Sequence, residues 1–215
     1  KIKNKRYYNI DTKKYKYFEN IEIKNNIALL KINGPGKVNV LNKKMFEDAQ
    51  NIFDNYILNN EEIKGVVFLS SKKDNFIAGA DIDMIQSVGS KEELINITKN
   101  GNDFFNRIKS KGLPFVAAID GSCMGGGLEW ALYCDYRIAT NNKKTVLSLP
   151  EVKLGLMPGM AGTYHLPKLI GLPNSLDIML TGKNVNFEEG SGGTFNQFKF
   201  TSMFSIHNSE NIRIL

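Results

Sequence analysis

Short apolar runs alternate along this chain with longer segments in which apolar residues recur every three or four positions. The short runs predict strands at residues 27–32, 66–69, 115–120, 136–139 and 145–149. The longer segments, residues 44–58 and 91–109, predict amphipathic helices. Strands that alternate with helices are typical of an α/β domain, and no linker, repeat or second domain is evident before residue 186.

Composition and charge narrow the classes of partner. The chain has 215 residues, 42% of them hydrophobic, and no run approaches the roughly 18 apolar residues of a membrane span. A net charge of +6 is compatible with a nucleic acid, an anionic membrane or an anionic ligand. The lysines are scattered among asparagines, without zinc-finger spacing or an RNA-binding aromatic motif. We therefore expect a solvated basic surface, no nucleic-acid partner and no transmembrane segment.

Neither metal nor dinucleotide chemistry is indicated. The two cysteines, Cys123 and Cys134, lack metal-ligand spacing, and the chain has only two histidines. Cys123 is interpreted as a small buried residue, because no histidine lies near it in sequence to activate a thiol. No strand is followed by the glycine fingerprint of an NAD site with an acidic residue about twenty positions on.

Two glycine-rich turns stand beside apolar strands. Residues 121–127, with three consecutive glycines, follow the strand at 115–120 and precede a helical segment. Residues 76–82 (FIAGADI) follow the strand at 66–69 after a polar loop. If these strands are parallel neighbours, their ends would present two backbone N–H donors at one crevice, the arrangement of an oxyanion hole. For the glycines alone, a tight strand-to-helix turn is an equally open interpretation.

Two glutamates each lie beside a glycine-rich turn in an otherwise apolar stretch. Glu129 lies between Leu128 and Trp130, and Glu151 lies between Pro150 and Val152. A lone glutamate is ordinarily a solvated surface charge. The apolar flanks indicate instead a buried pair of carboxyl groups for acid/base chemistry.

Three segments together resemble the crotonase (enoyl-CoA hydratase/isomerase) superfamily. They are FIAGADI, AAIDGSCMGGGLE and LPEVKLGLMPGMAGT, in that order and spacing. The resemblance covers roughly residues 21–186 and is strongest to the N-terminal hydratase domain of the fatty-acid-oxidation multifunctional enzymes, including the alpha subunit of the mitochondrial trifunctional protein. It implies an α/β fold built as a spiral of repeated β-β-α turns.

The same resemblance implies roles for individual residues. The oxyanion-hole N–H groups fall at Ala80 and Gly126, and the catalytic acids fall at Glu129 and Glu151. The implied substrate-binding positions are Ala78, Gly79, Asp81, Gly125 and Gly159, with Lys37 as a contact for the CoA phosphates. No cofactor is implied, since CoA is part of the substrate.

The resemblance implies an enoyl-CoA hydratase of fatty-acid β-oxidation, located in the mitochondrion. Two alternatives stay open: an enoyl-CoA isomerase, and an inactive fragment that binds acyl-CoA or partner subunits. The implied partners are an acyl-CoA substrate and either further copies of the chain or a thiolase-type subunit.

Residues 187–215 do not follow the family pattern. They contain a glycine cluster and scattered aromatic residues, without an evident helical period. We therefore expect a core over residues 1–186 that is truncated at its C-terminus, followed by a divergent tail from a truncated or frameshifted gene.

Overall fold

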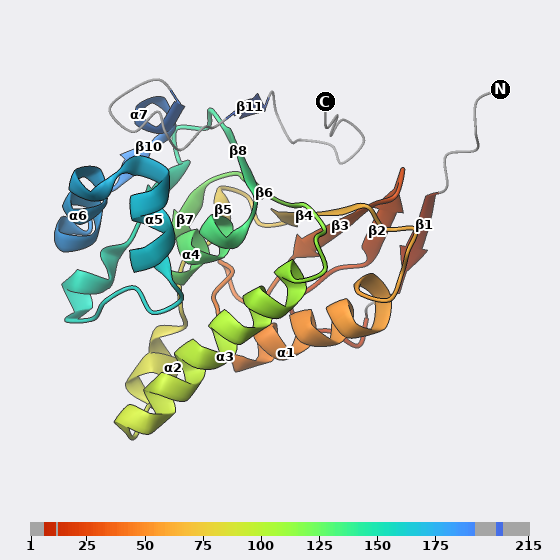
Figure 1. The fold of residues 1–215 in the computed structure, drawn as a ribbon, viewed down its shortest axis with the longest axis horizontal. Helices are drawn as coiled ribbons and strands as arrows, with labels where there is room; N and C mark the ends of the chain where they lie inside the picture. The colour runs from red at the N-terminus through yellow and green to blue at the C-terminus, as the bar shows by residue number, and fades with distance from the viewer. Residues whose placement is uncertain (1–6, 12, 192–200, 204–215) are drawn as a thin grey trace.

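The computed structural model describes residues 7–11, 13–191 and 201–203, and its described strands form two sheets (Figure 1). The seven-stranded sheet has the order β1 (Tyr7–Ile10), β2 (Ile21–Lys24), β3 (Ile27–Ile32), β4 (Gly65–Ser70), β6 (Phe115–Ile119), β8 (Tyr136–Thr140) and β11 (Thr201–Met203). Its first three strands pair antiparallel, and every later pair is parallel. The carboxyl ends of β4 and β6 therefore meet at one edge, which fulfils the condition set for two converging glycine turns.

The four-stranded sheet has the order β10 (Val185–Asn186), β9 (Val146–Ser148), β7 (Ser122–Met124) and β5 (Asn75–Ile77). Each parallel strand of this sheet follows a strand of the large sheet and leads into a helical segment, so that β4-β5, β6-β7 and β8-β9 begin three successive units. This arrangement confirms the predicted α/β fold as a spiral of β-β-α turns.

The interpretation of residues 121–127 as one glycine turn is wrong, because its centre is the strand β7. Cys123 pairs with Ile77 of β5 on one side and with Leu147 of β9 on the other. A strand of three residues shows no measurable alternation of apolar and polar positions. Its conformation is stabilised by hydrogen bonds to two neighbours that are distant in sequence.

The helices are α1 (Lys43–Ile52), α2 (Ile82–Gln86), α3 (Lys91–Lys109), α4 (Gly126–Tyr133), α5 (Gly162–Ile170), α6 (Leu172–Thr181) and α7 (Phe187–Ser191), with a π turn η1 (Phe53–Ile57) and a 3₁₀ turn η2 (Pro150–Leu154). The helix predicted at 91–109 is confirmed as α3, and Ser90 accepts a hydrogen bond from the Glu93 N–H at its start. The helix predicted at 44–58 is α-helical only to Ile52 and continues as η1. No helix in the described part of the chain has the length and apolar character needed to cross a membrane.

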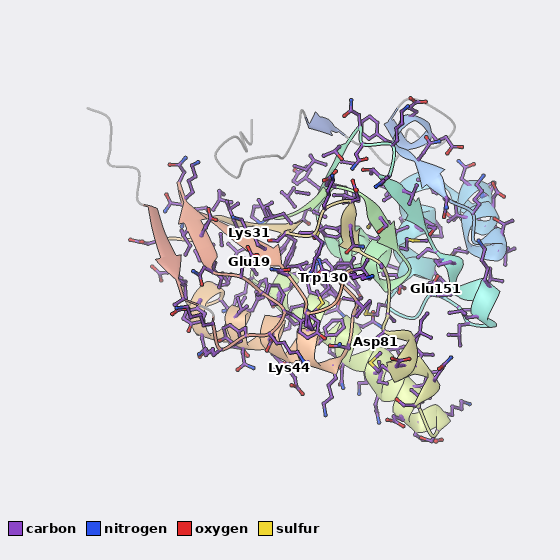
Figure 2. The ribbon with its side chains drawn as sticks, turned by 180° about the vertical axis from the view of Figure 1, so that it is seen from behind. Glu19, Lys31, Lys44, Asp81, Trp130 and Glu151 are labelled. Atoms are coloured by element: carbon purple, nitrogen blue, oxygen red, sulfur yellow. The ribbon has the colours of Figure 1, made fainter. Side chains whose placement is uncertain are left out.

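Aromatic side chains fill the core between the large sheet and the helices α1 and α3. Trp130 of α4 lies near the centre of the molecule (Figure 2), with its ring centroid 4.9 Å from that of Phe105 and 5.3 Å from that of Phe68. Phe68 also stacks on Phe115, with 6.1 Å between the centroids. All eight residues of α4 are buried. This helix, which begins at Gly126 and carries Glu129, is therefore a rigid central element.

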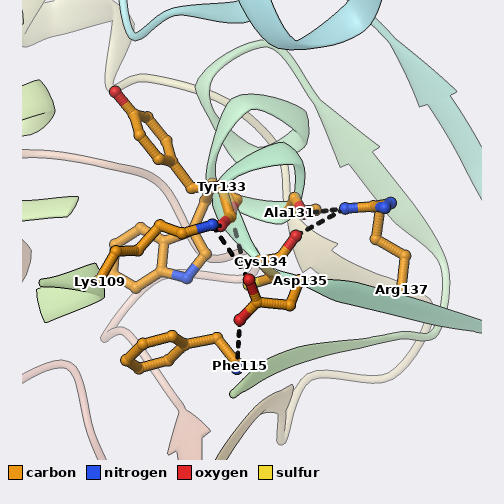
Figure 3. Close-up of polar contacts among 8 residues, drawn as sticks. Lys109, Phe115, Ala131, Tyr133, Cys134, Asp135 and Arg137 are labelled. Carbon is orange, nitrogen blue, oxygen red and sulfur yellow. Dashed lines mark hydrogen bonds and ion pairs between the residues drawn. The ribbon is translucent and has the colours of Figure 1, made fainter. Parts of the chain in front are cut away.

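Charged side chains hold the C-terminal end of α4 (Figure 3). Lys109 Nζ donates to the Tyr133 carbonyl at 2.9 Å, and Arg137 Nη1 donates to the Cys134 carbonyl at 2.8 Å. Asp135 accepts hydrogen bonds from Lys109 at 3.1 Å and from the Phe115 N–H at 2.8 Å. Cations at a helix C-terminus complement the helix dipole. The opposite end of α4, with its free N–H groups, faces the cleft.

Two described elements lie beyond Asn186. The Asn186 side chain accepts from the Glu189 N–H at 2.9 Å, and the Glu189 carboxylate accepts from the Asn186 N–H at 3.0 Å. This reciprocal cap begins α7, a helix that the sequence analysis missed although an Asn-x-x-Glu pattern signals it. Farther along, β11 extends the large sheet beside β8. The rest of the predicted tail, residues 192–200 and 204–215, lies outside the described residues.

Candidate active site

A cleft of about 1210 Å³ lies between α1, the α2–α3 segment and residues 156–160. Its apolar lining includes Leu41, Phe46, Met84, Ile97 and Met160. Both candidate acids and both candidate donors, Glu129, Glu151, Ala80 and Gly126, also line it. In Figure 2, Glu151 is labelled on η2 and Asp81 at the start of α2. A large apolar cleft with a few polar groups is typical of a small-molecule site.

The backbone N–H of Ala80 is a free donor. Leu41 pairs with Ala80 as an isolated parallel bridge, in which the Leu41 N–H donates to the Gly79 carbonyl and the Asp81 N–H donates to the Leu41 carbonyl, both at 2.8 Å. In this pattern the N–H of Ala80 points away from Leu41. Among the described residues it meets no acceptor.

The N–H of Gly126 is also free, because it begins α4. Gly125, with φ of +52°, turns the chain from β7 into this helix, a conformation that favours glycine. A methyl group built on Gly126 would lie 2.8 Å from Leu41 Cδ1 and 3.9 Å from the Ala80 nitrogen. A side chain at position 126 would have to displace Leu41, and the two free donors lie next to each other.

Glu129 lies in the first turn of α4 and is only 3% exposed. Its Oε1 accepts hydrogen bonds from the Met160 N–H at 2.7 Å and the Gly162 N–H at 2.8 Å. Burial raises the pKa of Glu129 to about 7, and the Glu151 charge adds to the rise, although the two backbone hydrogen bonds oppose it. The carboxyl group can therefore both take up and release a proton near neutral pH.

Glu151 lies in η2, directly after Pro150. Burial raises the pKa of Glu151 as well. Its Oε2 is buried and has no hydrogen-bond partner in the described ranges, while its Oε1 lies 3.2 Å from the position of a methyl group built on Gly125. A buried carboxyl oxygen without a partner on the cleft wall is available to a bound reactant.

Residues 159–162 hold Glu129 in a way that was not predicted from the sequence. A methyl group built on Gly162 would lie 2.9 Å from Glu129 Oε1, so the close approach of backbone and carboxylate requires this glycine. Tyr133 Oη donates to Asn102 Oδ1 at 2.6 Å, and Asn102 Nδ2 donates to the Gly159 carbonyl at 3.3 Å. The two glycines at positions 159 and 162 are the sequence signal that could have indicated this close approach.

Three of the remaining predicted residues shape the turn before α2. The Ala78 N–H donates to the Asn39 carbonyl at 2.8 Å. Gly79 has φ of +119°. Asp81 caps α2 by accepting from the Asp83 N–H at 3.1 Å. These contacts fix the backbone on both sides of Ala80 and thereby the position of its N–H group.

Gly159 lines the cleft, whereas Lys37 does not. A methyl group built on Gly159 would lie 2.7 Å from Thr98 Cγ2, so residues 156–160 pack closely on α3. Lys37 is exposed, in the turn after Gly36. Its contact with CoA phosphates stays a prediction.

The cysteines supply no nucleophile. Burial raises the pKa of the Cys123 thiol far above its usual range and that of Cys134 to about 12. His165 contacts the Tyr133 ring, with 4.6 Å between centroids. Both thiols therefore stay protonated, and the cleft offers carboxylates and backbone donors instead.

The spiral of β-β-α turns defines the architecture as crotonase-type. Residues 22–193 match the sequence profile of the family described as enoyl-CoA hydratase/isomerase, and the chain belongs to this family. The match extends past Asn186, where the resemblance had been expected to stop.

Solved structures agree with this assignment. An enoyl-CoA hydratase from Geobacillus kaustophilus superposes with a TM-score of 0.79 at 28% identity, over 89% of this chain and 70% of that one. An enoyl-CoA hydratase from Thermoplasma volcanium superposes with a TM-score of 0.77 at 28% identity, over 88% of this chain and 72% of that one. DspI from Pseudomonas aeruginosa superposes with a TM-score of 0.76 at 27% identity, over 86% and 72%.

Proposed function

We propose that this chain is an enoyl-CoA hydratase of fatty-acid β-oxidation, which adds water across trans-2-enoyl-CoA to give 3-hydroxyacyl-CoA. One observation carries the proposal: the buried carboxyl group of Glu129 and the half-buried one of Glu151, whose Oε2 is itself buried, share an apolar cleft with the free N–H groups of Ala80 and Gly126. Each of these groups meets one requirement of the reaction.

The thioester oxygen acquires negative charge when water attacks the conjugated double bond. The N–H groups of Ala80 and Gly126 would donate to this oxygen as an oxyanion hole. Loss of one such donor typically costs about 3 kcal/mol of barrier. Because both donors belong to the backbone, they need no reorganisation during the reaction.

The two carboxyl groups account for the protons. Glu129 takes a proton from the water, whose oxygen forms the bond to the β-carbon. The double-bond electrons move through the enolate, and the α-carbon then takes a proton from Glu151. This division requires a single proton on the pair, held by Glu151 while Glu129 is ionised. Repulsion between the two carboxyl groups disfavours the state in which both are charged, and burial raises the pKa of Glu151. The two acids would share one water, so the reverse assignment uses the same atoms.

Isomerisation is the competing reaction of the family. A single carboxylate suffices to shuttle an allylic proton, whereas hydration uses two groups. The buried, unpartnered oxygen of Glu151 therefore favours hydration.

The test is a hydration assay that follows the loss of the conjugated double bond. Glu129→Gln and Glu151→Gln are each expected to lower the rate by roughly 10²–10⁴-fold. Glu61→Gln, an exposed change at a residue that does not line the cleft, serves as the control for altered charge. Near-normal turnover at either position would remove that glutamate from the mechanism. Conversion of 3-enoyl-CoA without hydration would identify an isomerase, and binding without turnover an inactive fragment.

The finer context also rests on the resemblance. We propose kinship with the multifunctional-enzyme alpha subunit, a mitochondrial location, and association with further copies or a thiolase-type subunit. Cell fractionation and co-purification test these points independently of the hydration assay.

A further inference from the structure

The side chain of Met160 fills space that two glycines leave open inside the cleft. A methyl group built on Gly101 of α3 would lie 2.6 Å from Met160 Sδ. A methyl group built on Gly126 would lie 3.1 Å from Met160 Cε. The thioether of Met160 therefore lies against α3, and its terminal methyl group lies against the start of α4, beside the two free N–H donors.

The backbone of Met160 is held independently of its side chain. Its N–H donates to Glu129 Oε1 at 2.7 Å, and the next residue, Ala161, has φ of +66°. Any residue other than proline at position 160 keeps this hydrogen bond. Substitutions at Met160 can therefore change the cleft while the link to Glu129 is preserved.

Glycine at position 101 is unfavourable for the helix α3, and its contact with the Met160 side chain accounts for its presence there. It is a buried residue within the 19-residue helix α3, where glycine costs about 1 kcal/mol relative to alanine. The space above it holds the sulfur of Met160, so a methyl group at position 101 would displace the Met160 side chain from its observed position. Met160 in turn is only partly buried and lines the cleft.

The wall beyond Met160 is apolar. Met84 and Ile85 of α2 and Leu94 and Ile97 of α3 line it. The cleft volume of about 1210 Å³ exceeds the roughly 300–1,000 Å³ typical of ligand pockets. An extended apolar chain that starts at the two donors and follows this wall must pass Met160.

We propose that Met160 is a specificity-determining residue, whose thioether regulates access of long, unbranched acyl chains to the apolar wall of α2 and α3. This inference rests on the proposed function, because it takes the substrate to be an acyl thioester anchored at Ala80 and Gly126. Methionine suits the role because its unbranched, flexible side chain can move aside for a straight chain. A β-branched residue at the same position is stiff and cannot.

The experiment compares the parent with Met160→Ala and Met160→Ile on 2-butenoyl-CoA and 2-dodecenoyl-CoA. Met160→Ala is expected to raise the ratio of kcat/KM for the long over the short substrate by about tenfold, and Met160→Ile to lower it by a similar factor. Leu154→Ala, an exposed change on η2 away from the cleft lining, should leave the ratio unchanged. Ratios that agree within twofold across all variants would overturn the proposal.

Calorimetric binding of butyryl-CoA and dodecanoyl-CoA to the same variants separates this proposal from the proposed function. If no variant hydrates either substrate but the binding ratio shifts as expected, Met160 sets chain specificity in a protein that is not a hydratase. If hydration proceeds and both ratios stay constant, the hydratase assignment stands and the role of Met160 is refuted. Circular dichroism verifies folding. The two variants provide independent tests, because Met160→Ala removes side-chain volume whereas Met160→Ile keeps the volume and replaces a flexible side chain with a stiff one.

Discussion

Replacing Glu129 with glutamine should make the protein more stable at alkaline pH while abolishing its activity. Glutamine has the shape of glutamate, and its Oε1 can still accept hydrogen bonds from the Met160 and Gly162 N–H groups. In the parent these groups lie 2.7 and 2.8 Å from Glu129 Oε1. The substitution removes a negative charge from a site that is 3% exposed. It thus isolates the free-energy cost of ionising a buried carboxyl group.

The size of the effect follows from the pKa. Burial raises the pKa of Glu129 from 4.5 to about 7, and one pKa unit corresponds to about 1.36 kcal/mol. Because the folded-state pKa is the higher one, the folded protein binds the proton more tightly than the unfolded chain. The resulting stability is present below pH 4.5 and is lost as pH rises through about 7. The group therefore lowers the free energy of unfolding of the parent by about 3 kcal/mol between pH 4 and pH 8.

Urea unfolding of parent and variant at several pH values from 4 to 8 measures this difference. The free energy of unfolding of Glu129→Gln, relative to the parent, should rise by about 3 kcal/mol across the range. The exposed Glu61→Gln, away from the cleft, should show no such trend. A difference that stays flat with pH would mean that Glu129 ionises like an ordinary surface carboxyl group, and the argument from burial would fail.

Three further substitutions test the packing around the site. Gly126→Ala should lower the free energy of unfolding by about 1–3 kcal/mol and turnover by at least about 100-fold, because its methyl group would lie 2.8 Å from Leu41 Cδ1. In urea unfolding, the added substitution Leu41→Ala should recover part of the stability that overpacking costs. A double variant whose two losses simply add would contradict this explanation. Ala161→Gly should raise stability by up to about 1 kcal/mol, because the left-handed φ of +66° strains alanine; a lower urea midpoint would argue against strain. Tyr133→Phe should cost about 1 kcal/mol by removing the 2.6 Å hydrogen bond to Asn102, and an unchanged thermal midpoint would show that this bond contributes nothing.

The sequence by itself determined the elements whose residues repeat with a clear period. The strand at 27–32 and the helix at 91–109 have the predicted bounds, because each is long enough for its apolar positions to define a face. The glycine and glutamate motifs were also visible, since their residue types are unusual in apolar surroundings. Their order and spacing indicated the family that the profile match shows.

The tertiary structure alone decided the second sheet and the properties of the site. Of its short strands, β9 lies within the strand predicted at 145–149. The other two, β5 and β7, have three residues each and were not predicted, because pairing with distant neighbours stabilises them. Because β5 pairs with β7, the residues that follow these strands, Ala80 and Gly126, lie next to each other. The pKa of Glu129 depends on burial and on backbone donors more than thirty residues away in sequence. Burial and long-range hydrogen bonds are properties of the packed chain, and no local pattern of residues encodes their magnitude.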